Sequence, residues 1–541
     1  MDSIPCAQVP HSTPLLVDYL DRYERLADYY SGSPFDSEAY RRVADTIKIS
    51  DRHRRSLTEV LERQNRAFGC GDETLSRIDR LSRPGTLAVA TGQQVGLLGG
   101  PAFTLYKALS AIRLADSLTR QGLSSVPIFW LANEDHDFEE VAQTAVPGGD
   151  YEEVLLRDDG ERTAAQAPVG LTNYSAEISA TLDRLEALLP AGENRDRLLA
   201  DLRECYRPGV AWGEAFGRWM TKLFSRWGVV MLDPLDAEIH RMSVPLYARA
   251  LEDADRLRSA LLARSEALVR AGYHAQVRVQ ENSTLLFLAR NGSRTALHRG
   301  RAKGEFIVDD SEVLSGRELK RRLEERPLDF SANALLRPIV QDSLLPTVAY
   351  VGGAGELAYL GQAQSIYEIS GRAMPVVSVR ASFTLLDARI HRVMDRYRMS
   401  VEDVWQGKDH LTNKIAAGGF AEGWSEHFDQ SEQELRKLLE RLRGDIEKLD
   451  PTLHDALKHA EEKMKFQMER LRGKVARAAM ARSELLSRHE DSLLRFVMPG
   501  KTLQERKISG AYFLGCAGYG LLERLLELIP AESSEHRIVT Y

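Results

Sequence analysis

The stretch LAVATGQQVGLLGGPAFTLYK, residues 87–107, joins an apolar run to a glycine-rich loop and then to a helix-like segment. Its first part, Leu87–Ala90, has the length and apolar content of a buried strand, and the helix-like segment extends from Phe103 to Thr119. A strand, a loop and a helix in this order form the first half of a βαβ unit. The stretch therefore predicts an α/β fold.

Four further short apolar runs are also followed by turn or polar residues: Val126–Ala132, Val229–Leu232, Thr347–Val351 and Val376–Val379. Near-continuous apolar runs of this length are typical of parallel strands that are buried on both faces. Because longer helix-like stretches such as Glu356–Ser370 alternate with them, we expect a doubly wound parallel sheet. Ligands bind such sheets beyond the carboxyl ends of the strands, so the loops after these runs are the candidate site.

The runs are unevenly spaced, which predicts two insertions into one core. We expect the core to comprise residues 1–144, 226–240 and 331–386, with insertions at 145–225 and 241–330 and a helix-rich region at 387–541. Within the second insertion, the stretch Gln276–Arg299 predicts a hairpin that turns at Asn291-Gly292.

The helix-rich region contains a heptad pattern. Apolar residues recur at spacings of four and three, the pattern of a coiled-coil seam, at Leu435, Leu439, Leu442, Ile446 and Leu449. Asp450 and Pro451 then have the residue types of an N-cap and a first helical position. The pattern predicts a helical hairpin, and we expect a homodimer through these C-terminal helices.

Composition restricts the class of function. The 541 residues are 43% hydrophobic and 28% charged, as in an ordinary globular protein, and the net charge is −7. A mildly acidic chain lacks the basic field that draws proteins to nucleic acid, so we expect small-molecule substrates. No leader-like or membrane-spanning apolar segment is evident, which predicts a cytoplasmic protein without a membrane partner. The four cysteines are far apart, so we expect isolated reduced thiols and no zinc site.

The glycine-rich loop is the first candidate site. Its glycines allow backbone N–H groups to approach an anion, and Pro101 suits the first turn of a helix whose amino end favours negative charge. The expected substrate contacts are Thr91, Gly92, Gln93, Gln94, Gly96, Thr104 and Lys107. The alternative is a tight turn with glycines that serve packing alone.

The second candidate is the sequence NEDHD at residues 133–137, directly after an apolar run. Carboxylates around one histidine are costly unless they bind a cation, hold an ammonium group or share protons. We expect Asn133 to contact substrate, and Glu134, Asp135, His136 and Asp137 to be the catalytic candidates, with His136 and Asp137 foremost for acid/base or orienting roles. The alternative is a set of N-cap residues for a helix that begins near Asp137.

The third candidate, GGAGELA at 352–358, matches the GxGxxA dinucleotide fingerprint at Gly353, Gly355 and Ala358. The acidic residue expected about 20 positions later is absent, and Arg380 near that place favours NADP over NAD. Glu356 and Tyr359 are instead candidate substrate contacts. Helix packing alone also explains these glycines.

The last candidate is a loop near Pro499-Gly500 that carries Arg495, Lys501 and Arg506. Guanidinium and ammonium groups suit a phosphate, although a surface loop with ordinary charges fits equally well.

Several long strings resemble those of the bacillithiol biosynthesis cysteine-adding enzymes, a family also described as cysteine ligases. They are TGQQVGLLGGPAFTLYKALSAI at 91, PIFWLANEDHDFEEV at 127, GGAGELAYLGQ at 352, PVVSVRASFTLLD at 375 and FVMPGKTLQER at 496. The resemblance implies a Rossmann-like core related to class I aminoacyl-tRNA synthetases, two connecting-peptide insertions and a C-terminal coiled-coil domain that dimerises. The implied reaction forms an amide between L-cysteine and the amino group of glucosaminyl malate.

Under this resemblance, ATP activates the carboxylate, and both ADP-forming and AMP-forming routes stay open. The glycine-rich loop would hold a phosphate or the malate carboxylates, and the acidic cluster would bind an ammonium group. One of its carboxylates or His136 would deprotonate the attacking amine. The synthetase strings His-Ile-Gly-His and Lys-Met-Ser-Lys-Ser are absent, so we expect the nucleotide near Arg380, Ser382 and the loop that carries Arg495, Lys501 and Arg506. Magnesium accompanying the nucleotide is the one metal that this interpretation admits.

Two other classes of function stay open. An NADP-dependent oxidoreductase would use Gly353, Gly355 and Arg380. A non-catalytic coiled-coil scaffold of a thiol pathway would bind partners without turning over substrate.

Overall fold

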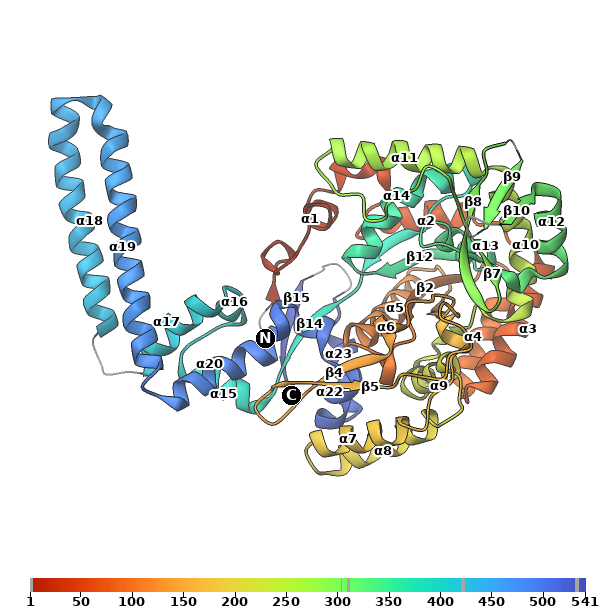
Figure 1. Ribbon diagram of the computed structural model, residues 1–541, viewed down its shortest axis with the longest axis horizontal. Coiled ribbons are helices and arrows are strands. Elements are labelled where there is room, and N and C mark those ends of the chain that lie inside the picture. Colours follow the sequence, from red (N-terminus) through yellow and green to blue (C-terminus); the bar gives the residue numbers. More distant parts are fainter. Residues whose placement is uncertain (1–2, 303, 309–311, 420–423, 531–534) are drawn as a thin grey trace.

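A five-stranded sheet forms the centre of the computed structural model, which describes residues 3–302, 304–308, 312–419, 424–530 and 535–541 (Figure 1). All neighbouring strands are parallel, in the order β13-β12-β2-β3-β6. The strands are β2 (Leu87–Gln94), β3 (Ser125–Ala132), β6 (Val230–Leu232), β12 (Thr347–Gly352) and β13 (Val376–Val379). These are the five runs predicted from the sequence, so the parallel sheet is confirmed.

Helices cover both faces of the sheet because successive strand residues point to opposite sides. Leu87 and Val89 of β2 pack into a cluster with Ala111 of α5 (Phe103–Arg120). Ala88 and Ala90 belong instead to a cluster that includes residues of α3 (Asp51–Ala67) and α14 (Ala354–Ser370). The fold is therefore doubly wound, and the order of the strands reverses between β2 and β12.

Two groups of additional elements lie between core strands in the sequence. Between β3 and β6 are the strand pair β4 (Gln143–Pro147) and β5 (Glu153–Arg157) and the helices α7 (Ile178–Leu188), α8 (Glu193–Cys205) and α9 (Trp212–Phe224). Between β6 and β12 are α10 (Ala237–Glu252), α11 (Ala254–Arg270), α12 (Gly316–Glu325) and an antiparallel sheet of order β10-β9-β8-β7-β11. The residue limits of the two insertions stay predictions.

The predicted hairpin of the second group is present. Strands β7 (Ser283–Arg290) and β8 (Ser293–Arg299) pair in antiparallel fashion. The turn residues Asn291 and Gly292 both have positive φ, 49° and 79°, as a two-residue hairpin turn requires.

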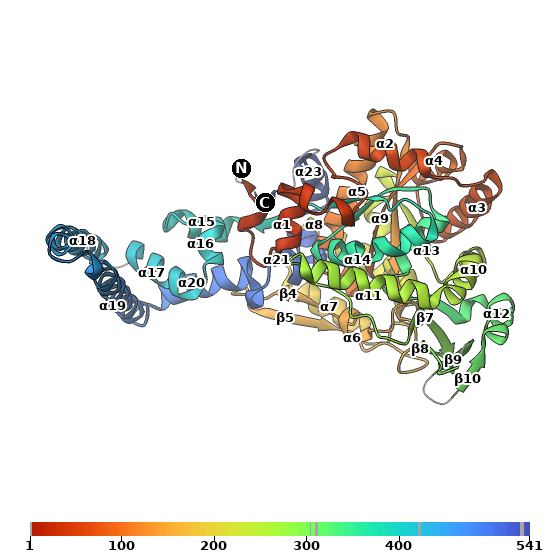
Figure 2. The same cartoon turned by 90° about the horizontal axis from the view of Figure 1, so that it is seen from above.

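A helical hairpin projects away from the main body in both ribbon views (Figures 1 and 2). It consists of α18 (Trp424–Leu449) and α19 (His454–Met480). Asp450 caps the turn by accepting the Thr452 N–H at 2.9 Å, but a short 3-10 turn, Pro451–Leu453, precedes the second α-helix. Leu439 is buried, whereas Leu449 is 81% exposed, so one chain covers only part of the predicted seam.

The end of the chain returns to the core instead of continuing the hairpin. β15 (His536–Thr540) pairs with β14 (Ser382–Leu386) in parallel and with β1 (Ser3–Ile4) in antiparallel orientation, so both ends of the chain lie together. α22 (Gly510–Ala517) begins beside the glycine-rich loop, where the Gly510 N–H donates to the Gly100 carbonyl at 3.1 Å. The segment after residue 507 is buried because many of its side chains are apolar and pack into the main hydrophobic core.

All four cysteines are free thiols. Within the described ranges, no helix has both the length and the apolar character needed to span a membrane. In the same part of the chain, no cluster of three or more His, Cys, Asp or Glu side chains is arranged to hold a metal ion.

Candidate active site

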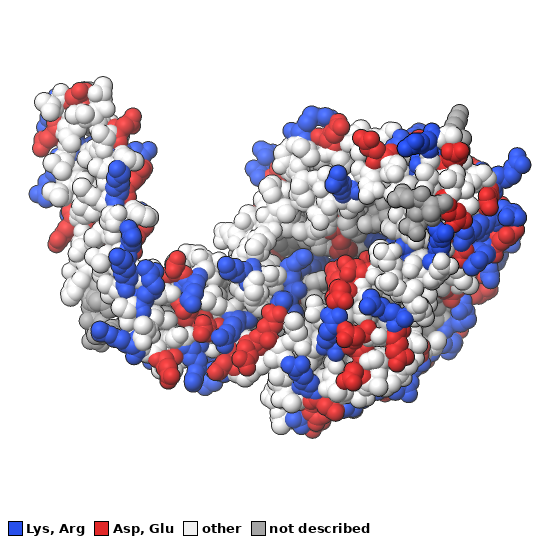
Figure 3. Space-filling view, in the orientation of Figure 1, with Lys and Arg blue, Asp and Glu red and all other residues white. Residues whose placement is uncertain are grey.

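A pocket of about 560 Å³ lies at the carboxyl ends of β2, β3 and β12, where the strand order reverses. Its walls come from the end of β2 (92–94), the loop after β3 (134–136) and the first turn of α14 (353–356). The antiparallel sheet of the second group contributes Phe287 and Arg294. Figure 3 shows a hollow between two parts of the main body, with basic and acidic side chains on its rim. This is the position at which doubly wound folds bind their ligands.

Lys107 and Glu356 form an ion pair in the wall of this pocket. The Lys107 ammonium also donates to the Gly92 carbonyl at 2.8 Å and to the Gln93 side chain at 2.9 Å. Burial lowers the pKa of Lys107, and the charge of Glu356 offsets only part of that effect. Lys107 thus holds β2 against α14, and its charge is already balanced.

The Glu356 carboxylate also closes the first turn of α14. It accepts the Gly353 N–H at 2.8 Å and the Tyr350 hydroxyl at 2.6 Å. Burial alone would raise the pKa of Glu356, but Lys107, Tyr350 and the Gly353 N–H outweigh it and lower the pKa. The helix terminus that the dinucleotide fingerprint would offer to a pyrophosphate is therefore occupied by a carboxylate of the same chain.

Three cations surround the ring of Phe103. Arg380 lies 5.0 Å from the ring centroid, and Lys107 and Arg506 each lie 5.9 Å from it. Arg380 is held by Glu505, whose carboxylate accepts one of its N–H groups at 2.7 Å. Arg506 is exposed, lines the pocket and has no carboxylate partner among the described residues. Its charge is available to a ligand.

Arg337 is a second guanidinium without a carboxylate partner in the described part of the chain. It donates to the Tyr359 hydroxyl at 3.0 Å and to the Gln341 side chain at 3.3 Å. Burial alone would lower the pKa of Arg337, but Tyr359, Tyr350 and Glu356 around it raise the pKa instead. A half-buried cation with neutral hydrogen-bond partners favours an anion in the pocket.

Carboxylates gather on the other side of the pocket. Gln94 donates to Asp135 at 3.2 Å and to Glu140 at 2.8 Å. Glu134 lies 3.5 Å from the Nε2 atom of His240, a buried histidine on α10. This acidic side suits an ammonium or amine group.

The Arg294 side chain extends from β8 to these carboxylates. It donates to the Ala332 carbonyl at 2.6 Å and lies 3.4 Å from both Asp135 Oδ1 and His136 Nδ1. Burial lowers the pKa of Arg294, although Glu134 and Asp135 oppose that effect.

Most of the predicted site residues line this pocket: Gly92, Gln93, Gln94, Lys107, Glu134, Asp135, His136, Glu356, Tyr359, Arg380 and Arg506. The sequence reasoning missed Arg294, Arg337, Tyr350, Glu140 and Trp130. No short motif marks these residues, because tertiary packing alone brings them to the pocket. The indole N–H of Trp130 is buried without a hydrogen-bond partner in the described residues.

Three predicted residues near the strand ends have structural roles outside the pocket lining. Thr91 donates to the Val351 carbonyl at 2.8 Å and so joins β2 to β12. Asn133 is buried and donates to Asp233 at 2.8 Å. Asp137 caps the short helix Phe138–Val141, which is the N-cap alternative.

Three predicted nucleotide contacts also lie outside the pocket lining. Ser382 bonds to Glu505 and His536, at 3.0 and 2.7 Å. Arg495 reaches the Asp150 carbonyl at 3.4 Å, and the Lys501 carbonyl accepts from His11.

The glycine-rich loop does not form the predicted anion cradle. The Gly96, Gly99 and Gly100 N–H groups donate to carbonyls within the loop, at 2.9 to 3.0 Å, and the loop is buried. Thr104 is likewise buried, with no hydrogen-bond partner in the described residues for its hydroxyl. Gly99 lies against Trp219, where a Cβ atom would come within 2.9 Å of the indole nitrogen. Close packing accounts for these glycines in this structure.

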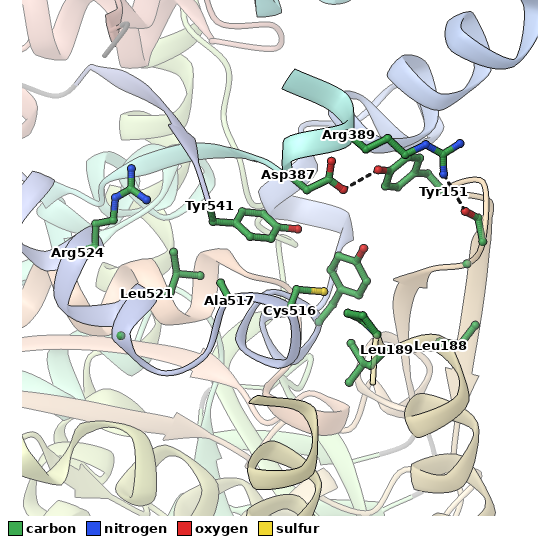
Figure 4. Close-up of a pocket in the computed structure, with 15 residues that line it drawn as sticks. Tyr151, Leu188, Leu189, Asp387, Arg389, Cys516, Ala517, Leu521, Arg524 and Tyr541 are labelled. Atoms are coloured by element: carbon green, nitrogen blue, oxygen red, sulfur yellow. Dashed lines mark hydrogen bonds between the residues drawn. The ribbon is translucent and has the colours of Figure 1, made fainter. Parts of the chain in front are cut away.

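A second pocket, of about 810 Å³, lies between the first group of additional elements and the C-terminal segment (Figure 4). Tyr151 donates to Asp387 there at 2.6 Å, and Cys516 and Tyr541 face the same space. Burial raises the pKa of the Cys516 thiol to about 11. None of the predicted site residues lines this pocket.

Comparison with known proteins matches the whole chain to one family. The model of the bacillithiol biosynthesis BshC N-terminal Rossmann-like domain matches residues 2–381, and that of the BshC C-terminal coiled-coil domain matches residues 383–541. Proteins named "Putative cysteine ligase BshC" are similar over nearly all of both chains. The protein from Koribacter versatilis is 36% identical, with 99% of each chain covered, and that from Solibacter usitatus is 35% identical, with 98% of each covered. The protein from Salinibacter ruber is 31% identical, with 99% of each covered. The chain, with its Rossmann-like core and C-terminal coiled-coil domain, belongs to the BshC family of bacillithiol biosynthesis.

Proposed function

We propose that this protein is a ligase that joins the carboxyl group of L-cysteine to the amino group of glucosaminyl malate, in the last step of bacillithiol biosynthesis, with ATP as the activating substrate. Membership of the BshC family and the cysteine ligase names of the relatives support this reaction. A free carboxylate does not form an amide with an amine in water without activation, which is the role we assign to ATP.

The observation that carries the proposal is that one pocket contains both guanidinium groups without carboxylate partners in the described residues and a separate group of carboxylates. Arg337 and Arg506 bring guanidinium groups that lack carboxylate partners among the described residues, whereas Glu134, Asp135 and Glu140 bring carboxylates. The substrates have the complementary charges: malate and ATP are anionic, and cysteine and the amino sugar carry amino groups. One pocket can thus orient both reactants.

The two guanidinium groups without carboxylate partners in the described residues differ in burial, and we assign them to different anions. Arg337 is half-buried and fixed by Tyr359, which suits the bidentate binding of a malate carboxylate. Arg506 is exposed, and we assign it to the phosphates of ATP with any accompanying Mg²⁺. Arg380 supports this second region through the ring of Phe103.

On the acidic side, we assign Glu134 to the attacking amine. Asp135 already accepts from Gln94 and from the backbone N–H of His136, at 3.2 and 2.8 Å. Glu134 lies 3.5 Å from His240 and near the charge of Arg294, but among the described residues its carboxylate accepts no hydrogen bond, so it is the less committed of the two. A carboxylate within hydrogen-bond reach of the amine can hold the ammonium and accept its proton.

The direct test is reconstitution of the reaction. Purified protein is incubated with cysteine, ATP and glucosaminyl malate, the thiol product is labelled and identified by mass spectrometry, and ADP and AMP are quantified. We expect bacillithiol in a one-to-one ratio with one of the two nucleotide products. If the protein formed a complex with partner proteins but made no product, the non-catalytic scaffold would be favoured. If it bound NADPH tightly but made no product, the NADP-dependent oxidoreductase would be favoured.

We also propose that two copies associate through the helical hairpin. Apolar side chains remain exposed along it, among them Leu442, Met464, Phe466 and Leu471. Exposed apolar side chains on a projecting pair of helices are stabilised when a second copy with the same pattern covers them. We place the protein in the cytoplasm, where ATP and reduced cysteine are both supplied.

A further inference from the structure

Arg294 is fixed in one orientation at the boundary between β8 and the acidic side of the pocket. Its Nε–H donates to the Ser331 hydroxyl at 2.9 Å, and an Nη2–H donates to the Ala332 carbonyl at 2.6 Å. The guanidinium lies 3.8 Å from the centroid of the Phe287 ring, and the side chain is 10% exposed. Three different contacts therefore hold a single rotamer.

This orientation directs the remaining Nη1 atom to His136. Nη1 lies 3.4 Å from His136 Nδ1 and 3.4 Å from Asp135 Oδ1. Arginine has N–H donors and no acceptor, so Nδ1 of the imidazole must be the acceptor. Asp135 does not take the place of this donor, because its Oδ1 is 3.6 Å from Nδ1 and accepts the His136 backbone N–H instead.

A neutral imidazole that accepts at Nδ1 carries its proton on Nε2. His136 lines the pocket, so this Nε2–H is the polar group that the ring can offer to a ligand. In that state the ring donates a hydrogen bond and has no free nitrogen lone pair with which to remove a proton from an amine.

We propose that Arg294 is a positioning residue that holds His136 in the Nε2–H tautomer, so that His136 donates a hydrogen bond to an oxygen of the activated cysteine carboxyl group. This inference rests on the proposed ligase function and deepens it. Removal of the proton from the attacking amine is then left to a carboxylate, for which Glu134 is placed. A donor aimed at an oxygen that gains negative charge stabilises the transition state.

The tautomer is measurable without turnover. Full-length protein with 15N-labelled histidine is examined by NMR, and the His136 signals are identified by their loss in His136→Asn. In the wild type we expect a protonated Nε2 and an unprotonated Nδ1. In Arg294→Met, which has no donor, we expect the Nδ1–H form to appear, and in Arg294→Lys we expect the wild-type pattern to be partly restored.

Arg299→Met is the matched control. Arg299 lies on the same strand, packs 4.8 Å from the Phe306 ring centroid and bonds to Asp255 at 3.0 Å, but it does not line the pocket. This variant should leave the His136 tautomer unchanged. A wild-type His136 with its proton on Nδ1, or a tautomer that Arg294→Met leaves unaltered, would overturn the inference.

Kinetic measurements distinguish a hydrogen-bond donor from a general base at position 136. The side-chain amide of glutamine can donate near the position of Nε2 but cannot act as a base at neutral pH. We expect His136→Ala to lower kcat by about 100-fold, and His136→Gln to recover at least about tenfold of that loss. Equal losses in the two variants would contradict the donor role. If the wild type forms no bacillithiol at all, the proposed function fails, while the NMR measurement still decides whether Arg294 sets the tautomer.

Discussion

At the scale of single residues, the ion pair between Lys107 and Glu356 is central to the pocket wall. Lys107 is 4% exposed and Glu356 is 18% exposed, so neither charge is well solvated. Removing one partner of such a pair leaves the other charge without compensation, which costs more than the pair itself contributes.

We therefore predict that Glu356→Gln lowers the free energy of unfolding by about 3 to 5 kcal/mol. The double variant Lys107→Met/Glu356→Gln should recover part of this loss, because no uncompensated charge remains. Urea denaturation of the three proteins provides the measurement. A Glu356→Gln protein as stable as the wild type would show that Lys107 finds another partner.

His536 in the C-terminal strand gives a prediction for pH. It lies between the hydroxyls of Ser382 and Thr384, at 2.7 and 2.8 Å, and burial lowers its pKa to about 4. An unfolded histidine titrates near pH 6.5, so the unfolded state binds the proton first as the pH falls. The stability contributed by neutral His536 is therefore fully present above about pH 6.5, and it is lost as the pH falls from about 6.5 towards about 4.

Between pH 7 and pH 5, the wild type should lose about 2 kcal/mol more stability than His536→Gln, which cannot titrate in this range. Hydrogen exchange of the β15 amides at the two pH values measures this locally. Equal losses in the two proteins would assign the acid sensitivity to other groups.

The motif after β3 shows how far residue types alone can be interpreted. The sequence identified NEDHD as a site, and Glu134, Asp135 and His136 do line the pocket. It could not separate them from Asn133 and Asp137, because those two differ only in which partner the fold supplies. Both carry short polar side chains that suit a site, but Asn133 donates to Asp233 and Asp137 caps a helix.

At the scale of elements, the core strands were predictable because burial on both faces requires continuous apolar runs. The β7–β8 turn was predictable because Asn-Gly suits two successive positive φ angles. The pairing of β15 with β14 and β1 was not, since these short strands come from distant parts of the chain and carry no shared pattern. The sequence could not decide between packing and anion binding for the glycine-rich loop, because both select the same small residue.

Gly92 illustrates the packing requirement on β2. A Cβ atom there would lie 2.8 Å from the Trp130 carbonyl oxygen and 3.0 Å from its Cβ, and both belong to the neighbouring strand. Gly92→Ala should therefore destabilise the protein by about 1 to 3 kcal/mol, as overpacking of a rigid core does.

Gly355→Ala is the control for this substitution. Gly355 lies in the same pocket, but its added Cβ would meet only the Gln276 side chain, at 3.9 Å. Urea midpoints should place Gly355→Ala near the wild type and Gly92→Ala well below it. Equal midpoints would indicate that β2 and β3 can separate without cost.

At the scale of the whole molecule, the pocket is built from segments that are far apart in the sequence. Arg294 and Arg337 belong to elements that lie between β6 and β12 in the sequence, and Arg506 belongs to the C-terminal segment. The sequence predicted the hairpin that carries Arg294 and grouped Arg506 with Arg380, but it identified neither Arg294 nor Arg337 as a pocket residue. The projecting hairpin, by contrast, followed directly from a local heptad pattern.

The hairpin provides a prediction for assembly. We expect the wild type to be a dimer in multi-angle light scattering, and the variant Leu442→Glu/Met464→Glu/Leu471→Glu to be a monomer, because like charges would replace apolar contacts across the interface. Lys458→Glu, a change at an exposed polar position of the same hairpin, should leave the dimer intact. A wild-type monomer would contradict this assignment of the apolar face.

In the proposed function, the cationic side of the pocket binds the malate portion of the substrate. The most direct test compares kcat/KM for glucosaminyl malate with that for methyl glucosaminide, which lacks the carboxylates, in the wild type and in Arg337→Gln. Loss of one charge-assisted contact of about 1.5 to 3 kcal/mol should reduce the preference for glucosaminyl malate by about 10- to 100-fold. An unchanged preference would contradict this role of Arg337 and would place the malate carboxylates elsewhere.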